Sequence, residues 1–192
     1  TNVMGTLHIL EAIRTINSVQ ATVLITTDKC YQNREWYWGY REIDPMGGHD
    51  PYSSSKGAVE LLIASYRDSF LPNIASVRAG NVIGGGDWRP NRLIPDCVTA
   101  LRASEPIIVR SPDSIRPWQH VLEPIHGYML LAQKMRTDPK KYSGAWNFGP
   151  DKESMKKVLD IVNLVIEGWG NTKTEAIIRQ SDYHETKILM LD

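Results

Sequence analysis

Residues 21–29 read Ala-Thr-Val-Leu-Ile-Thr-Thr-Asp-Lys, and this stretch decides the fold. Its apolar, β-branched first part is typical of a strand buried in a parallel sheet. The strand then ends on three polar residues, Thr27, Asp28 and Lys29. Because parallel sheets bind their ligands at the carboxyl ends of the strands, the stretch predicts both an α/β fold and the edge where its site lies.

A second motif, Asp50-Pro51-Tyr52-Ser-Ser-Ser-Lys56, predicts a helix that starts at Pro51 and runs to about residue 70. Proline suits the first helical turn, where a missing N–H costs nothing. Tyr52 and Lys56 are four residues apart and therefore share one face. A lysine ammonium near a phenol favours the phenolate, which can take a proton from a substrate hydroxyl. Taken alone, the two could also be an ordinary surface pair.

The remaining pattern alternates helices with strands. We predict helices over residues 2–17, 51–70, 91–103, 121–136 and 153–167, and strands over 21–27, 74–79, 107–109 and 145–148. This alternation predicts a doubly wound parallel, Rossmann-like sheet with helices on both faces. We also expect a helical pattern to continue into the last residues, Leu191 and Asp192.

No Gly-x-Gly-x-x-Gly turn stands between a first strand and a helix, and the run Gly84–Gly86 has the wrong surroundings for one. We therefore expect the chain to be an internal piece of a longer protein, without its first glycine motif and its C-terminal end. We expect this piece to be inactive on its own.

Composition narrows the function classes. Hydrophobic residues make up 42% and charged residues 23% of the chain, as in globular proteins. Lys plus Arg (22) equal Asp plus Glu (22) with no basic run, which argues against a nucleic-acid partner. No apolar segment approaches the roughly 20 residues that span a bilayer. Cys30 and Cys97 form neither a disulfide framework nor a metal motif, so we expect a cytoplasmic protein without a metal site.

Together these motifs resemble the extended short-chain dehydrogenase/reductase family, in which Tyr-x-x-x-Lys follows a strand ending in Ser or Thr. Further matching motifs are Asn2-Val3-Met4-Gly5-Thr6, Arg78-Ala79-Gly80-Asn81 and Arg116-Pro117-Trp118. An aspartate after the threonine is similar to the nucleotide-sugar 4,6-dehydratases, whereas epimerases carry small or uncharged residues there. Residues 28–31, 33–36 and 38–42 most resemble the dehydratases that act on CDP-glucose.

The resemblance implies NAD as cofactor and a nucleotide sugar, CDP-glucose, as substrate. It implies that Thr27 binds the sugar 4-hydroxyl, that Tyr52 removes its proton, and that Lys56 assists Tyr52 and binds the nicotinamide ribose. Asp28 would protonate the oxygen that leaves C6, although it could instead cap the following turn. Lys29 stands where most dehydratases have a glutamate. It could take the C5 proton, stabilise the enolate, or serve only as an ion-pair partner.

The resemblance also implies binding residues. On the cofactor side they are Tyr52, Lys56 and Ala79; on the substrate side they are Thr27, Asn81, Arg92, Leu93, Arg116, Asn147 and His184. Arg116 would bind the diphosphate, since a guanidinium can donate two parallel hydrogen bonds to phosphate oxygens. Arg116 and His184 could instead be surface residues, and Asn147 an ordinary turn residue.

The resemblance divides the chain at residue 88. Residues 1–88 would be the later half of an NAD-binding domain, and 89–192 mostly a nucleotide-sugar-binding part with segments returning to the first domain. It further implies a homo-oligomer. Two other functions stay open: an epimerase or decarboxylase of the same family, and a non-catalytic module that binds nucleotide sugars. Asp28 and Lys29 argue against the former, and an intact set of Thr27, Tyr52 and Lys56 against the latter.

Overall fold

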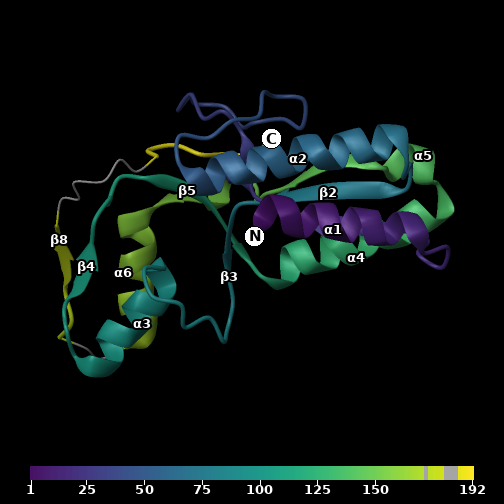
Figure 1. Ribbon diagram of the computed structural model, residues 1–192. Helices are drawn as coiled ribbons and strands as arrows, with labels where there is room; N and C mark the ends of the chain where they lie inside the picture. The colour runs from purple at the N-terminus through teal and green to yellow at the C-terminus, as the bar shows by residue number, and fades with distance from the viewer. Residues whose placement is uncertain (171–172, 180–185) are drawn as a thin grey trace.

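The computed structural model describes residues 1–170, 173–179 and 186–192 (Figure 1). Its centre is a three-stranded sheet in the order β1 (Thr22–Ile25), β2 (Ile74–Ala79) and β6 (Gly144–Phe148). β2 is paired in parallel with both neighbours. The predicted parallel sheet is therefore confirmed.

Helices cover both faces of this sheet, as the doubly wound arrangement requires. Helices α1 (Asn2–Thr15) and α2 (Pro51–Ser69) lie on one face, and α4 (Leu122–Thr137) with the short α5 (Pro139–Tyr142) on the other (Figure 1). The alternation of side chains along β2 explains the two layers. Ile74 packs with α1 and α2 in a cluster with Leu10, Val59 and Ile63. Ala75 and Val77, which point to the opposite face of the sheet, pack with Leu131 and Met135 of α4.

A second region lies beside the sheet (Figure 1). It consists of α3 (Leu93–Ala103), α6 (Val158–Trp169) and the parallel pair β4 (Ile107–Val109) and β8 (Ala176–Ile178). Its core is apolar and is formed by Cys97, Leu101, Ile107, Val109 and Val162. β6 and α4 come after residue 88 in the chain but belong to the central layers.

Three short strands connect the two regions, and none of them was predicted. β3 (Asn81–Ile83) pairs in parallel with β5 (Ile115–His120), which pairs in an antiparallel manner with β7 (Met155–Lys157). The predicted helix over 153–167 is therefore wrong in its first part. The 3₁₀ turn η2 (Lys152–Ser154) and β7 occupy that part, and the helix begins at Val158.

The helical pattern expected at the end of the chain is also wrong. Ile188 forms a β-bridge with Ile115, and Leu191 forms one with Tyr40. Leu189 and Leu191 are both buried, against Tyr31 and Tyr40 among others. A spacing of two between buried residues is the period of an extended chain, not of a helix.

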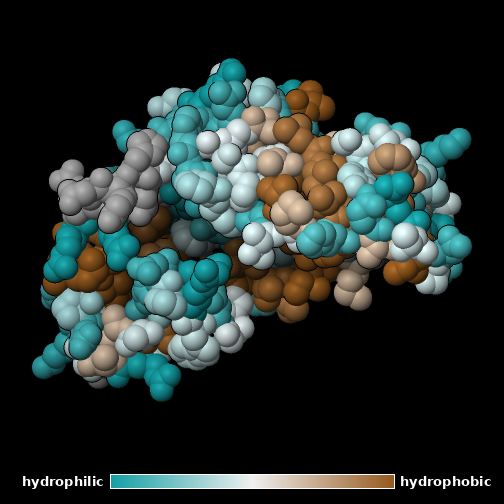
Figure 2. Space-filling view, viewed as in Figure 1, coloured by the Kyte–Doolittle hydropathy of each residue, from teal (hydrophilic) through white to brown (hydrophobic). Residues whose placement is uncertain are grey.

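Apolar side chains are visible over α1, α2 and α4 on the face shown in Figure 2. Large exposed apolar residues in these helices are Met4, Ile9, Leu61, Leu122, Ile125, Met129 and Leu130. Within the described ranges, no helix is both long and apolar enough to cross a membrane.

Candidate active site

Thr27 and Asp28 form the turn that follows β1. The backbone N–H of Thr26 still donates to Val77 O of β2 (2.8 Å), and the chain then enters the 3₁₀ turn η1 (Asp28–Cys30). Thr27 caps this turn, since its hydroxyl accepts a hydrogen bond from the Lys29 N–H (3.4 Å). The same hydroxyl donates to Asp28 Oδ1 at 2.9 Å. The capping role of Thr27 thus fixes the Asp28 carboxyl beside it.

The Asp28 carboxyl lies in a tight, buried space. Asp28 is 3% exposed, and its Oδ2 has no hydrogen-bond partner within the described parts of the chain. A Cβ at Gly80 would come within 3.2 Å of Oδ2 and 2.4 Å of the Pro117 side chain, so only glycine fits there. Burial raises the pKa of Asp28 to about 6, against the opposing effects of the Thr27 hydrogen bond and the charges of Lys29 and Arg116. Asp28 therefore keeps its proton up to a pH of about 6, well above the usual range of a carboxyl group.

Helix α2 begins at Pro51 as predicted, and Asp50 is its N-cap. The Asp50 carboxylate accepts from the N–H groups of Tyr52 (2.9 Å) and Ser53 (3.0 Å). The hydroxyl of Ser53 also donates to it at 2.6 Å, and this bond lowers the pKa of Asp50. Asp50 was not among the predicted site residues, although an aspartate before a proline at a helix start was a readable signal.

Tyr52 and Lys56 lie together on α2. The Lys56 Nζ is 5.8 Å from the centroid of the Tyr52 ring. The Tyr52 side chain is about half exposed, so its phenol is open to a ligand. Asn2 ties this turn to α1, since its amide donates to Ser55 Oγ at 2.9 Å.

The turn η1 packs directly on α2, which brings the two motifs to one edge of the sheet. A Cβ at Gly57, the residue after Lys56, would lie 3.2 Å from Cys30 O, so glycine allows the close approach. The same carbonyl accepts a hydrogen bond from the Gly47 N–H (2.9 Å). Asp28 and Lys29 are therefore held against the turn of α2 that carries Lys56.

Arg116 lies within β5, a strand absent from the sequence prediction. Its guanidinium donates to the carbonyls of Ile115 (2.9 Å), Thr186 (2.5 Å) and Lys187 (3.3 Å). Its positive charge also acts on Asp28 and lowers the pKa of that carboxyl. Arg116 thus joins the C-terminal segment to the neighbourhood of Asp28.

The other predicted binding residues are spread more widely. Ala79 is the buried last residue of β2, and Asn81 begins β3 one residue after Gly80. Arg92 is the N-cap of α3 in the second region, with its guanidinium 3.8 Å from the Asp87 carboxylate, and Leu93 is the first residue of that helix. His184 lies outside the described residues.

Asn147 lies within β6 and is only partly buried. Its Oδ1 accepts from the Tyr31 hydroxyl (2.6 Å), and its Nδ2 donates to Tyr40 O (2.7 Å) and Asp192 O (3.3 Å). Its backbone N–H donates to the Glu42 carboxylate at 2.7 Å. The amide of Asn147 is therefore already used within the fold.

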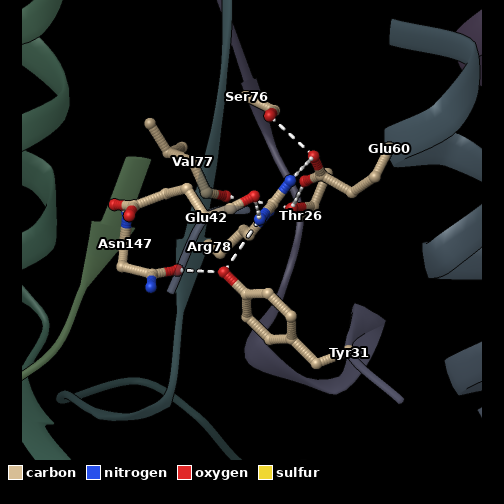
Figure 3. A network of polar contacts seen from close by, with 8 residues as sticks. All are labelled: Thr26, Tyr31, Glu42, Glu60, Ser76, Val77, Arg78 and Asn147. Atoms are coloured by element: carbon tan, nitrogen blue, oxygen red, sulfur yellow. Dashed lines mark hydrogen bonds and ion pairs between the residues drawn. The ribbon is translucent and has the colours of Figure 1, made fainter. Parts of the chain in front are cut away.

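Behind the site lies a buried polar network that sequence analysis missed (Figure 3). Its centre is an ion pair of 2.7 Å between Arg78 and Glu60, two side chains that are almost fully buried. The Arg78 guanidinium also donates to the Tyr31 hydroxyl at 2.8 Å. The sequence did contain a signal for these two residues. Glu60 follows Lys56 at helical spacing, and Arg78 begins the motif Arg78-Ala79-Gly80-Asn81.

The model of the NAD dependent epimerase/dehydratase family matches residues 1–149. This chain belongs to the NAD dependent epimerase/dehydratase family. The resemblance inferred from the two motifs is thereby confirmed.

Two curated relatives are dehydratases of nucleotide sugars. The chain is 49% identical over 201 residues to a CDP-glucose 4,6-dehydratase of Salmonella typhimurium, covering 100% of the chain and 56% of that protein. It is 26% identical over 178 residues to a dTDP-glucose 4,6-dehydratase of Streptomyces griseus, covering 90% of the chain and 51% of that protein. The chain thus spans about half the length of the curated relatives it matches.

Solved structures share the fold of this family member. A dTDP-glucose 4,6-dehydratase from Bacillus anthracis, in complex with NAD, superposes with a TM-score of 0.85 at 21% identity, covering 100% of this chain and 58% of that one. A UDP-glucose 4-epimerase from Thermotoga maritima gives a TM-score of 0.84 at 16% identity, with 100% and 60% covered. Because dehydratases and epimerases fit equally well, the fold alone does not distinguish them. The distinction has to come from the residues of the site.

Proposed function

We propose that this chain carries the catalytic residues of a nucleotide-sugar 4,6-dehydratase that converts CDP-glucose to CDP-4-keto-6-deoxyglucose and water. The observation that carries the proposal is the buried Asp28, held beside Thr27 with a pKa of about 6. Epimerisation needs no acid at C6, whereas dehydration does. The 49% identity to the Salmonella dehydratase supports the same choice, including CDP-glucose as substrate.

The oxidation at C4 uses Thr27, Tyr52 and Lys56. Tyr52 takes the proton of the 4-hydroxyl, and Thr27 holds that hydroxyl in place by a hydrogen bond. The Lys56 ammonium beside the ring stabilises the phenolate form of Tyr52. The 4-keto group that forms makes the C5 proton acidic.

The loss of water uses Asp28 and Lys29. Protonated Asp28 gives its proton to the oxygen that leaves C6, which turns a poor leaving group into water. Lys29, the next residue, takes the C5 proton on its amine nitrogen, so the substrate loses a proton to Lys29 and a hydroxyl group that leaves as water with the proton of Asp28. A buried acid and an adjacent amine thus have separate parts in one step.

The residues present fit the nicotinamide side of NAD. Lys56 and the half-exposed Tyr52 offer donors for the ribose hydroxyls, and Ala79 is the last residue of β2. When bound, NAD would supply the hydride acceptor for C4 and the hydride donor for C6, so it would be regenerated in each cycle. We assign residues 1–88 mainly to this side and residues 89–192 mainly to the nucleotide sugar.

Substrate contacts are supported to different degrees. Arg116, whose charge reaches Asp28, is suited to the diphosphate, and Asn81 follows the Gly80 that packs on Asp28. Arg92 and Leu93 at the start of α3 would contact the nucleotide, and His184 the substrate side. Asn147 has the weakest support, because its amide already bonds to Tyr31, Tyr40 and Asp192.

The proposal includes a cytoplasmic homo-oligomer. Two free, buried cysteines are usual for a reducing compartment. Exposed apolar residues on α1 and α2, such as Met4, Ile9 and Leu61, offer a surface for a second copy (Figure 2). Light scattering after gel filtration would measure the oligomeric state.

The activity test uses the full-length gene product that contains this chain, with CDP-glucose and NAD. We expect a 4-keto-6-deoxy product and no net accumulation of NADH. UDP-glucose and dTDP-glucose serve as competing substrates under the same conditions, and CDP-glucose should have the highest kcat/KM. Steady release of NADH, or a C4 epimer as the product, would contradict the proposed function.

A further inference from the structure

Tyr52, Lys56 and Glu60 follow one another at intervals of four residues on α2, so they lie along one face of the helix. The first two are the reacting pair, but Glu60 is buried, with only 3% exposed. A carboxylate in such a position needs partners. It has three: Arg78 Nη2 at 2.7 Å, Ser76 Oγ at 2.7 Å, and the hydroxyl of Thr26 (Figure 3).

These partners come from both strands that end at the site. Ser76 and Arg78 are on β2, whereas Thr26 follows β1 and directly precedes Thr27. One carboxylate therefore connects the reacting face of α2 with the strand end that carries the sugar-binding hydroxyl and the acid. No other hydrogen bond or ion pair of the described residues joins an α2 side chain to the end of β1.

Arg78 extends the connection to the chain that leaves η1. Its Nη1 donates to the Tyr31 hydroxyl (2.8 Å) and to Glu42 O (3.1 Å). Burial raises the pKa of Tyr31, so the phenol stays protonated and can donate to Asn147. Both sides of the turn that holds Asp28 and Lys29 are thereby fixed to the same ion pair, through Thr26 before it and Tyr31 after it.

We propose that Glu60 and Arg78 are a positioning pair that sets the spacing between Tyr52–Lys56 and Thr27–Asp28. The inference rests on the proposed function for the roles of those four residues. A buried ion pair is weak evidence for stability, since well-packed apolar residues often replace it at no cost. The effect of such a pair on the geometry of the site is larger, because a misplacement of about 1 Å in a reacting group can cost about 100-fold in rate.

The test removes the pair without leaving an unpaired charge. In the full-length gene product, the double variant Glu60→Leu/Arg78→Met replaces both partners by apolar residues of similar size. Val59→Ala is the matched control: Val59 is the neighbouring buried residue of α2, and it packs with Leu10, Ile63 and Ile74 away from the network. Each protein is measured for its melting temperature, its Kd for the nucleotide sugar, and the single-turnover rate of NADH formation.

We expect the double variant to keep a melting temperature at or above that of Val59→Ala and a nearly unchanged Kd. We expect its rate of NADH formation to fall about 100-fold, consistent with a misplaced reacting group. Val59→Ala should lose stability and keep its rate. A double variant that is folded and forms NADH at the wild-type rate would overturn the proposal.

The two proposals can fail separately. NADH formation needs only the first hydride transfer, so a wild-type protein that oxidises a nucleotide sugar without dehydrating it would contradict the proposed function and leave this test valid. A crystal structure of the double variant gives a readout independent of activity. We expect the first turn of α2 to shift relative to residues 27–30 by more than the roughly 0.5 Å that a reacting constellation tolerates. Unchanged positions would overturn the positioning role.

Discussion

The two faces of β2 differ in how they hold their helices. Toward α4 the strand presents Ala75 and Val77, which pack against apolar side chains such as Met135. Toward α2 it presents Ile74 first and then two buried polar residues, Ser76 and Arg78, as it approaches the site. Apolar packing stabilises without direction, whereas hydrogen bonds and ion pairs fix positions. The fold therefore has one face that only adds stability and one face that, beyond its apolar cluster, also places reacting groups.

If this comparison is correct, the largest effect on activity comes from the α2 side. Tyr52→Phe removes the phenol that takes the 4-hydroxyl proton, and general-base catalysis contributes about 10²–10⁴-fold in rate. We expect no detectable first hydride transfer in a single-turnover measurement of NADH absorbance. Tyr66→Phe is the control, because this tyrosine lies on the same helix but bonds to Glu11 of α1. Equal loss in both variants would contradict a specific role of Tyr52.

The next effect separates the two chemical steps. Asp28→Asn keeps the shape of the buried side chain but cannot supply the acid proton. We expect C4 oxidation to continue and the loss of water to slow by about 10²-fold or more. Bound NADH should therefore accumulate in a single turnover. A variant that stops before NADH appears would show that Asp28 acts earlier than the elimination.

The α4 side should respond in stability and not in rate. Met135→Ala removes a fully buried side chain from the cluster with Val77 and Leu131. Such truncations cost about 2–5 kcal/mol in the free energy of unfolding. We expect a lower denaturation midpoint and an unchanged kcat at temperatures where the variant is folded. A large loss of kcat with little loss of stability would remove the distinction between the two faces.

The same distinction explains what the sequence could predict. Apolar periodicity located α2, β2 and β4 to within a residue or so, because burial of one face leaves a regular pattern. β5 and β7 were missed, since Arg116, Gln119 and Lys156 interrupt any such pattern, and β3 (Asn81–Ile83) is too short to show one. Their pairing depends on partners far away in the chain, and pairing of that kind leaves no local signal.

At the site, local motifs named Thr27, Asp28, Tyr52 and Lys56, because spacing along one strand and one helix is enough to find them. The Glu60–Arg78 pair required knowledge that α2 lies over β2, which is a tertiary fact. Asn147 shows where local patterns stop being informative. Its place at the end of a strand suggested a ligand contact, and the structure adds bonds from its amide to the carbonyls of Tyr40 and Asp192, which lie far from it in the sequence.

The smallest effect concerns pH and the stability cost of the buried acid. Burial raises the pKa of Asp28 from 3.8 to about 6, so the folded state binds this proton more tightly than the unfolded state. The favourable contribution of the protonated group is complete below the unfolded pKa and is lost as the pH rises through about 6. Above that value the ionised carboxylate is buried at a cost on the order of 3 kcal/mol.

Asp28→Asn removes this cost, and the variant should therefore gain stability over the wild type as the pH rises. We expect nearly equal free energies of unfolding near pH 3 and a difference on the order of 3 kcal/mol near pH 7.5. Urea denaturation of both proteins across this range measures it. Asp50→Asn is the control with the opposite sign, because the hydrogen bond from Ser53 lowers the pKa of Asp50. A stability difference between wild type and Asp28→Asn that does not change with pH would mean that Asp28 is not held as an acid by its burial.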